Sequence, residues 1–67
     1  MREKMNRMRE ARLRVDKSQL QMMKETKIHY STLSRIERGW IIPTQKQRSL
    51  IATALNATVD WIFPDEE

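Results

Sequence analysis

Apolar residues recur at helical spacing in two short segments within residues 18–39. Met22 and Met23 share one face of the first segment, while Leu33 and Ile36, three positions apart, mark the buried face of the second. The sequence between the two segments interrupts this pattern. We therefore predict two short helices joined by a tight turn, with the second helix carrying the function.

Residues suited to helix ends flank both segments. Ser18 is a good N-cap for the first helix, expected over 19–26, because its hydroxyl can accept from a free backbone N–H one turn on. The second helix is expected to begin near His29 or Tyr30. Gly39, the only glycine, follows this helix and suits a left-handed C-terminal cap. Together these features have the shape of a helix-turn-helix motif.

Three further helices are expected, one before this motif and two after it. Residues 1–15 lack Pro and Gly, and a stripe of apolar side chains predicts one amphipathic helix there. The stripe steps by three or four residues: Met1, Met5, Met8, Ala11 and Val15. Thr44 and Thr58 are suitable N-caps for two later helices, expected to end near Leu55 and Phe63. No strand pattern occurs, so the expected fold is all-α with five helices.

Length and composition narrow the class of protein. The 67 residues allow one domain, 1–67, with a short acidic tail at 64–67. With no cysteine and one histidine, we expect no disulfide, no metal and no cofactor. No triad or Gly-rich phosphate loop is present, so we expect neither an enzyme nor a small-molecule ligand. No run approaches the roughly 18 apolar residues of a membrane span, which predicts a cytoplasmic protein without a membrane partner.

The net charge of +4 is unevenly distributed along the chain. Residues 1–17 carry a net charge of +4, residues 18–43 a net charge of +2, and residues 44–67 a net charge of −2. One end of the domain is therefore suited to face a polyanion while the other turns away. On charge alone, an ordinary solvated surface explains the pattern equally well.

The outward side of the second motif helix, about 29–37, is the candidate reading surface. If Leu33 and Ile36 face the interior, its first turn and Arg35 face outward, as in a helix that reads the major groove. Arg35 can donate two hydrogen bonds to guanine, and the Thr32 methyl can meet a thymine methyl. The predicted base-reading residues are Tyr30, Ser31, Thr32 and Arg35.

The same stretch resembles the Cro and lambdoid-repressor helix-turn-helix family, often called XRE. The hexamer SRIERG, residues 34–39, is the most specific part of this resemblance. The similarity extends to both flanks, at residues 8–14, 43–44, 51–56 and 58–63, and together with the residues between them it covers about sixty of the 67 residues. It implies a compact five-helix, lambda-repressor-like domain that binds double-stranded DNA.

The chain departs from the family pattern within and around the first motif helix. Asp16 and Lys27 stand where the family usually has glycine, so we expect positive φ at both positions. Thr26 replaces a usual leucine, and Leu20 is apolar where the family is usually polar. A different register within this helix therefore stays open.

The resemblance also implies roles outside the reading surface. Arg12 and Glu37 match family positions that form an ion pair, and Gln19 matches a phosphate-contacting glutamine. His29 stands where a Ser or Thr cap is common, and it is either a DNA contact or a structural surface residue. The predicted phosphate contacts are Gln19, His29, Ser34, Arg38, Trp40 and, in addition to its ion pair, Arg12.

Large apolar residues near the C-terminus and in the loop 40–43 suggest a partner surface. Trp61, Ile62 and Phe63 are either core or a dimer surface, since family members often dimerise through this region. Together with Trp40, Ile41 and Ile42 they are numerous for so short a chain, and an exposed cluster usually marks an interface. We expect a homodimer on a palindromic operator with half-sites roughly 34 Å apart.

The leading hypothesis is a sequence-specific DNA-binding regulator, most simply a small Cro-like repressor of phage or mobile-element type. Two alternatives use the apolar surface of residues 40–43 and 61–63. One is an antitoxin that binds DNA and also covers a protein partner. The other is a protein–protein adaptor that keeps the helical fold without reading DNA.

Overall fold

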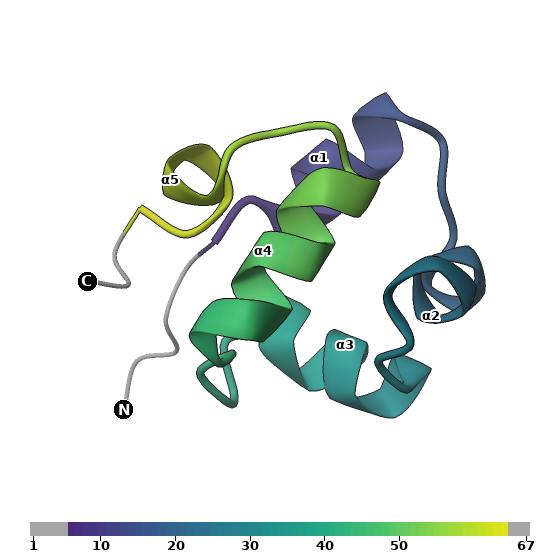
Figure 1. The fold of residues 1–67 in the computed structure, drawn as a ribbon, viewed down its shortest axis with the longest axis horizontal. Coiled ribbons are helices and arrows are strands. Elements are labelled where there is room, and N and C mark those ends of the chain that lie inside the picture. Colours follow the sequence, from purple (N-terminus) through teal and green to yellow (C-terminus); the bar gives the residue numbers. More distant parts are fainter. Residues whose placement is uncertain (1–5, 65–67) are drawn as a thin grey trace.

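The computed structural model describes residues 6–64. These residues form five helices and no strand: α1 (Met8–Arg14), α2 (Gln19–Thr26), α3 (Tyr30–Glu37), α4 (Gln45–Ala54) and α5 (Val59–Ile62). In Figure 1, α4 crosses the centre, with α3 below it, α2 to the right and α5 to the upper left. The prediction of an all-α, five-helix fold is confirmed. Within this part of the chain, no helix has the length and apolar character needed to cross a membrane.

The predicted N-caps begin three of the five helices. The Ser18 hydroxyl accepts from the backbone N–H of Gln21 at 3.1 Å, and this cap fixes the register of α2. Thr44 caps α4 in a reciprocal box, because the Gln47 side chain in turn accepts from the Thr44 backbone N–H. Thr58 caps the single turn of α5. Local side-chain chemistry therefore sets where these helices start.

The first helix begins later than the sequence pattern predicts. Residues 1–5 lie outside the described part of the chain, and Asn6 and Arg7 are not helical, so α1 starts at Met8. The Asn6 side chain accepts from the Met8 N–H and donates to the Ile36 carbonyl at 2.8 Å. This link ties the chain before α1 to the end of α3. The helix predicted over residues 1–15 therefore starts at Met8.

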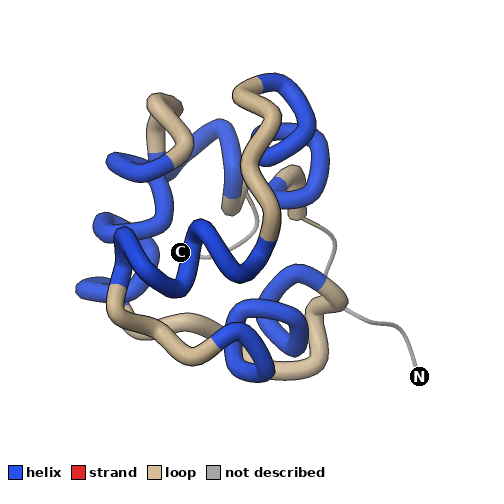
Figure 2. The backbone as a smooth tube through the Cα atoms, turned by 90° about the vertical axis from the view of Figure 1, so that its right-hand side faces the viewer, coloured by secondary structure: helices blue, strands red, loops and turns tan. Residues whose placement is uncertain are grey.

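One core cluster unites the five helices. It consists of Met8, Ala11, Met22, Ile28, Leu33, Ile36, Ile51, Ala52, Leu55, Ile62 and Phe63. α2 packs against both α3 and α4, and α4 also packs against α5. The rotated backbone view in Figure 2 shows the short helices and the loops that connect them. Of the predicted stripe on the first helix, Met8 and Ala11 are buried and Val15 is half-buried, while Met1 and Met5 lie outside the described residues.

Two of the three predicted partner-surface residues belong to this core. The Ile62 and Phe63 side chains are 0% and 2% exposed, so neither is accessible to a partner. The Arg7 N–H donates to the Ile62 carbonyl at 2.8 Å, which docks α5 against the start of α1. Only Trp61 remains partly exposed, with the guanidinium groups of Arg7 and Arg14 at 5.1 and 4.6 Å from its ring. The predicted surface is therefore wrong for Ile62 and Phe63.

The connections on both sides of α2 use left-handed residues where the sequence predicted them. Asp16 and Lys27 have φ of 57° and 65°, and Gly39 after α3 has φ of 77°. Thr26, at the end of α2, is buried, but its hydroxyl donates to the Met22 carbonyl and accepts from the Ile28 N–H. A buried hydroxyl with both roles satisfied explains how threonine is tolerated where an apolar residue is usual.

The positive φ of Lys27 strains the backbone, and a substitution can remove this strain. Lys27→Gly should raise the free energy of unfolding by about 1 kcal/mol, because glycine has no Cβ to clash at positive φ. Lys24→Gly, an exposed change within α2, should instead lower it by about 1 kcal/mol. Urea unfolding of both variants measures the difference. Equal destabilisation by the two glycines would show that Lys27 is not strained.

A lysine in the α1–α2 turn joins two other helices. The Lys17 ammonium donates to the Glu25 carboxylate of α2 at 2.7 Å and to the Ala54 carbonyl at the end of α4 at 2.6 Å. The hydrogen bond from Lys17 lowers the pKa of the Glu25 carboxyl below its usual value. The contact with Ala54 also places a cation against the negative end of the α4 dipole.

Candidate nucleic-acid interface

The orientation of α3 separates a buried side from a side open to solvent. Leu33 and Ile36 are both 0% exposed and pack into the core. Arg35 is exposed, Tyr30 is 46% exposed, and Ser31 and Thr32 are half-buried. Of the four residues predicted to read bases, Tyr30 and Arg35 are therefore the most accessible, and Ser31 and Thr32 are partly shielded.

A histidine caps the start of α3. The His29 Nδ1 atom accepts from the Ser31 backbone N–H at 3.1 Å and lies 2.9 Å from the Ser31 hydroxyl. The imidazole also stacks on the Tyr30 ring, with the centroids 4.6 Å apart. His29 was predicted to be either a DNA contact or a structural residue. It has a structural role, because it caps α3 at Ser31 and stacks on Tyr30. A phosphate contact by the same ring stays a prediction.

Removing this cap should loosen the start of α3. His29→Ala should lower the free energy of unfolding by about 0.5–2 kcal/mol, because the Ser31 N–H loses its acceptor. His29→Asp should retain most of the stability, since a carboxylate is a strong N-cap at the positive end of a helix dipole. Thermal or urea unfolding compares the two variants. An alanine variant as stable as the wild type would rule out the cap.

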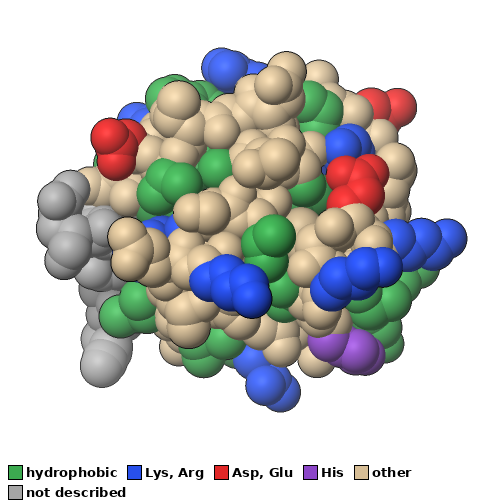
Figure 3. Space-filling view, viewed as in Figure 1, with side chains coloured by type: hydrophobic (Ala, Val, Ile, Leu, Met, Phe, Trp, Pro, Cys, Tyr) green, Lys and Arg blue, Asp and Glu red, His purple; other side chains and the backbone are tan. Residues whose placement is uncertain are grey.

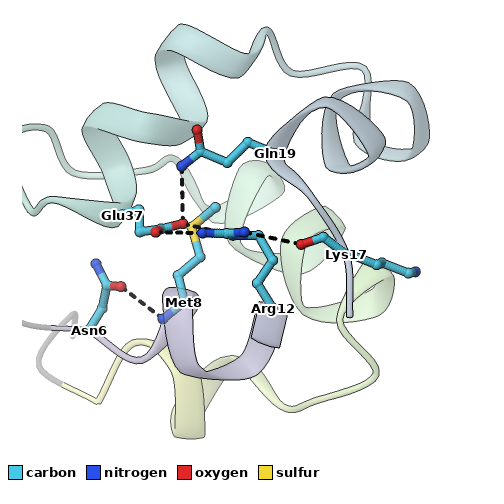
Figure 4. A network of polar contacts seen from close by, with 6 residues as sticks. All are labelled: Asn6, Met8, Arg12, Lys17, Gln19 and Glu37. Carbon is cyan, nitrogen blue, oxygen red and sulfur yellow. Dashed lines mark hydrogen bonds and ion pairs between the residues drawn. The ribbon is translucent and has the colours of Figure 1, made fainter. Parts of the chain in front are cut away.

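An ion pair braces the base of the motif (Figure 4). Arg12 of α1 donates from Nε and Nη2 to the two carboxylate oxygens of Glu37 at 3.1 and 3.0 Å. Its Nη1 donates to the Lys17 carbonyl, and the Gln19 amide of α2 donates to Glu37 from the other side. The two charged side chains are only 14% and 11% exposed. This bidentate geometry fixes α1, α2 and the end of α3 relative to one another.

The same network limits what Arg12 and Gln19 offer to DNA. Each nitrogen of the Arg12 guanidinium already donates within the protein, and the Gln19 amide nitrogen is directed at Glu37. Their predicted phosphate contacts stay predictions, and the geometry gives both residues a structural role. Sequence reasoning foresaw the Arg12–Glu37 pair through the resemblance but not the part that Gln19 takes in it.

The far end of α3 carries the remaining predicted backbone contacts. Gly39 turns the chain, and the Trp40 N–H donates back to the Arg35 carbonyl at 2.9 Å. The Arg38 guanidinium lies 5.0 Å from the centroid of the Trp40 ring, a cation–π contact that holds this cation at the helix end. Ser34, one turn earlier, is half-buried. The three residues thus border one end of the outward face of α3.

Charge on the surface agrees with this placement. In the space-filling view of Figure 3, several Lys and Arg side chains lie in the lower half, on the side of α2, α3 and the start of α4, others lie near the top, and the Asp and Glu side chains of this face lie higher than the lower group. Arg35 and Arg38 on α3 and Lys27 just before it are exposed cations, which favour approach to a polyanion. No group of three His, Cys, Asp or Glu within residues 6–64 is placed to hold a metal ion.

One residue that the sequence reasoning did not assign borders the same region. Leu20, in the first turn of α2, is 55% exposed and shares an open hollow with Tyr30. The available signal was its apolar character at a position where polar residues are usual. Leu20 lies two residues from buried Met22, on the opposite side of the helix, so core packing does not account for it.

Comparison with known families agrees with the geometry. The helix-turn-helix family model matches residues 8–62, a range that includes all five helices. No curated protein matches the chain. The matched range includes the Arg12–Glu37 brace, the buried side of α3 and its exposed face. The chain therefore belongs to the XRE-type helix-turn-helix family of DNA-binding proteins.

Proposed function

We propose that the protein is a small Cro-like transcriptional repressor that binds a specific double-stranded DNA sequence. The observation that carries this proposal is the burial of Leu33 and Ile36, which leaves Tyr30 and Arg35 on the open side of α3. An α-helix with its side chains is about 10–12 Å in diameter, which suits a major groove about 12 Å wide. Occupying a promoter in this way blocks transcription without an effector domain.

The two ends of α3 have different tasks in this proposal. Arg35 reads a guanine through its O6 and N7 atoms, with Tyr30, Ser31 and Thr32 contacting neighbouring base edges. Arg38, Ser34 and Trp40 contact the backbone, which sets the register of the helix in the groove but carries little sequence information. The Arg12–Glu37 brace keeps α3 in its orientation while it does so.

Exposed apolar residues after α3 support a homodimer on a palindromic operator. Trp40, Ile41 and Ile42 form a run of exposed side chains in the loop that precedes α4. Because Ile62 and Phe63 are buried, this loop is more accessible to a second copy than the C-terminal segment is. Within that segment, Trp61 is a further candidate because it is partly exposed. Two copies would place their α3 helices roughly 34 Å apart, one turn of DNA.

Selection of bound duplexes from a random pool at physiological salt tests the proposal. We expect an enriched palindrome whose half-sites are centred about 10–10.5 base pairs apart or a multiple of this spacing. An enriched single half-site would support sequence reading without the dimer. A pool that shows no enrichment after repeated rounds would refute sequence-specific binding.

The salt dependence of binding shows whether a cation contacts the DNA phosphate backbone or stays in solvent. Arg38→Ala should reduce the slope of log affinity against log salt by about 0.9 for each subunit bound, because one phosphate is no longer neutralised. Arg14→Ala is the matched control, since this guanidinium also lies over a tryptophan ring but on the α1–α5 side. Affinity titrations from low to physiological salt give the slopes. Equal slopes in Arg38→Ala and the wild type would exclude the phosphate contact.

The loop 40–42 also favours a second candidate, an antitoxin-type protein that binds DNA and covers a protein partner. Three adjacent exposed apolar side chains are a suitable partner surface. Co-purification of a second small protein, lost in Ile42→Ser, would support this function. Purification of the chain alone with unimpaired operator binding would favour the simple repressor.

A further inference from the structure

We propose that Leu20 and Tyr30 form an apolar site for the C5-methyl group of one thymine beside the start of α3, which makes Leu20 a determinant of sequence preference. This inference rests on the proposed DNA binding. It assigns a reading role to a residue of α2, outside the recognition helix itself.

The hollow between the starts of α2 and α3 brings the two side chains together. It is lined by Arg12, Ser18, Gln19, Leu20 and Tyr30. Leu20 is 55% exposed and Tyr30 is the first residue of α3, so the hollow continues the proposed reading surface onto α2. A duplex that receives the start of α3 would bring its groove edge to this hollow.

Three polar side chains that line the hollow make hydrogen bonds within the protein. The Ser18 hydroxyl caps α2, and the amide nitrogen of Gln19 donates to Glu37. The Arg12 guanidinium donates to Glu37 and to the Lys17 carbonyl. These hydrogen bonds account for the placement of the polar side chains, whereas the exposed Leu20 side chain has no such internal role and forms an apolar wall of the hollow with the Tyr30 ring.

The chemistry of DNA then identifies the group that fits. In the major groove, the C5-methyl of thymine is the apolar group among the base-edge patterns that distinguish the four base pairs. Deoxyribose carbons are also apolar, but they belong to the backbone and carry no sequence information. Because Tyr30 opens the helix that we place against base edges, the methyl group is the occupant that we assign.

Removing one methyl group at a time from the DNA tests the thymine site directly. In the selected duplex, each thymine is replaced in turn by deoxyuridine, which removes only the methyl group, and affinity is measured at constant salt. We expect a position in each half-site, besides any that Thr32 contacts, at which the wild type loses about four-fold in affinity, the value for one buried methyl group. Leu20→Ala should bind thymine and uracil at that position equally.

Matched variants separate the site from general effects. Leu13→Ala, an exposed leucine on α1 outside the hollow, should keep the full methyl dependence. Leu20→Ala is expected to fold, since Leu20 is exposed and alanine is a better helix former; its unfolding curve verifies this.

Each other outcome overturns the inference. If uracil is tolerated at every position, or if the methyl effect persists in Leu20→Ala, Leu20 does not read a thymine. If Leu20→Ala weakens all duplexes equally, the residue touches a sugar. In these cases sequence-specific binding survives and the proposed function stands, whereas a selection without any enriched sequence refutes both.

Discussion

Glu37→Ala should lower the free energy of unfolding by about 3 kcal/mol, the lower end of the range for breaking a buried pair. The Arg12 guanidinium would then keep its charge at 14% exposure without a carboxylate partner, and the Gln19 amide would lose its acceptor. A 67-residue domain has a total stability of only about 3–10 kcal/mol, so a loss of this size is a large fraction of the total. Urea unfolding followed by circular dichroism measures the loss.

Two comparisons show whether the loss comes from the unpaired charge. Arg14 and Glu10 form an exposed pair one turn apart on α1, at 3.4 Å, and Glu10→Ala should change stability by no more than about 0.5 kcal/mol. The double variant Arg12→Met, Glu37→Leu should regain most of the stability, because it removes both charges and keeps apolar volume. A loss in Glu37→Ala no larger than in Glu10→Ala would show that the brace is not needed.

Arg35→Ala should lose about 1–3 kcal/mol of discrimination at one base pair of each half-site while binding to unrelated DNA persists. The reason is that alanine removes two directed hydrogen bonds to a guanine, whereas the other cations of this face still attract phosphates. Affinities for the selected duplex and for its single-base variants measure the change. The largest loss should fall on substitutions of a guanine.

Arg35→Lys is the informative control for the reading role. Lysine keeps the positive charge but lacks the planar fork that matches guanine bidentately. We expect it to retain nonspecific affinity and to lose most of the base preference. If specific and nonspecific affinity instead fall equally in Arg35→Ala and recover in Arg35→Lys, Arg35 contacts only a phosphate.

Local sequence signals predicted the helix boundaries that depend on neighbouring residues. Ser18, Thr44 and Thr58 cap their helices through contacts three residues away, and Gly39 and Lys27 adopt the left-handed conformations expected after helices. These features lie within one turn of the chain. The buried side of α3 was also predictable, because the spacing of two aliphatic residues defines a helix face.

The features that sequence reasoning missed depend on contacts between distant segments. The late start of α1 follows from Asn6 bonding to the Ile36 carbonyl, 30 residues away. The sequence left Ile62 and Phe63 open between core and partner surface. Their burial follows from packing of α5 against α4 and from the hydrogen bond between Arg7 and Ile62, for which the sequence carries no local signal. Leu20 was visible as an apolar departure from the family pattern, but its pairing with Tyr30 required the placement of α2 beside α3.

The ratio of affinities for the selected duplex and for a shuffled duplex of the same composition, at 0.15 M salt, tests the role of α3 most directly. For the wild type we predict a ratio of about 10³ or more, as for specific DNA-binding proteins. In Arg35→Ala the ratio should fall, with affinity for the shuffled duplex retained. Equal affinity of the wild type for both duplexes would contradict a reading role for α3.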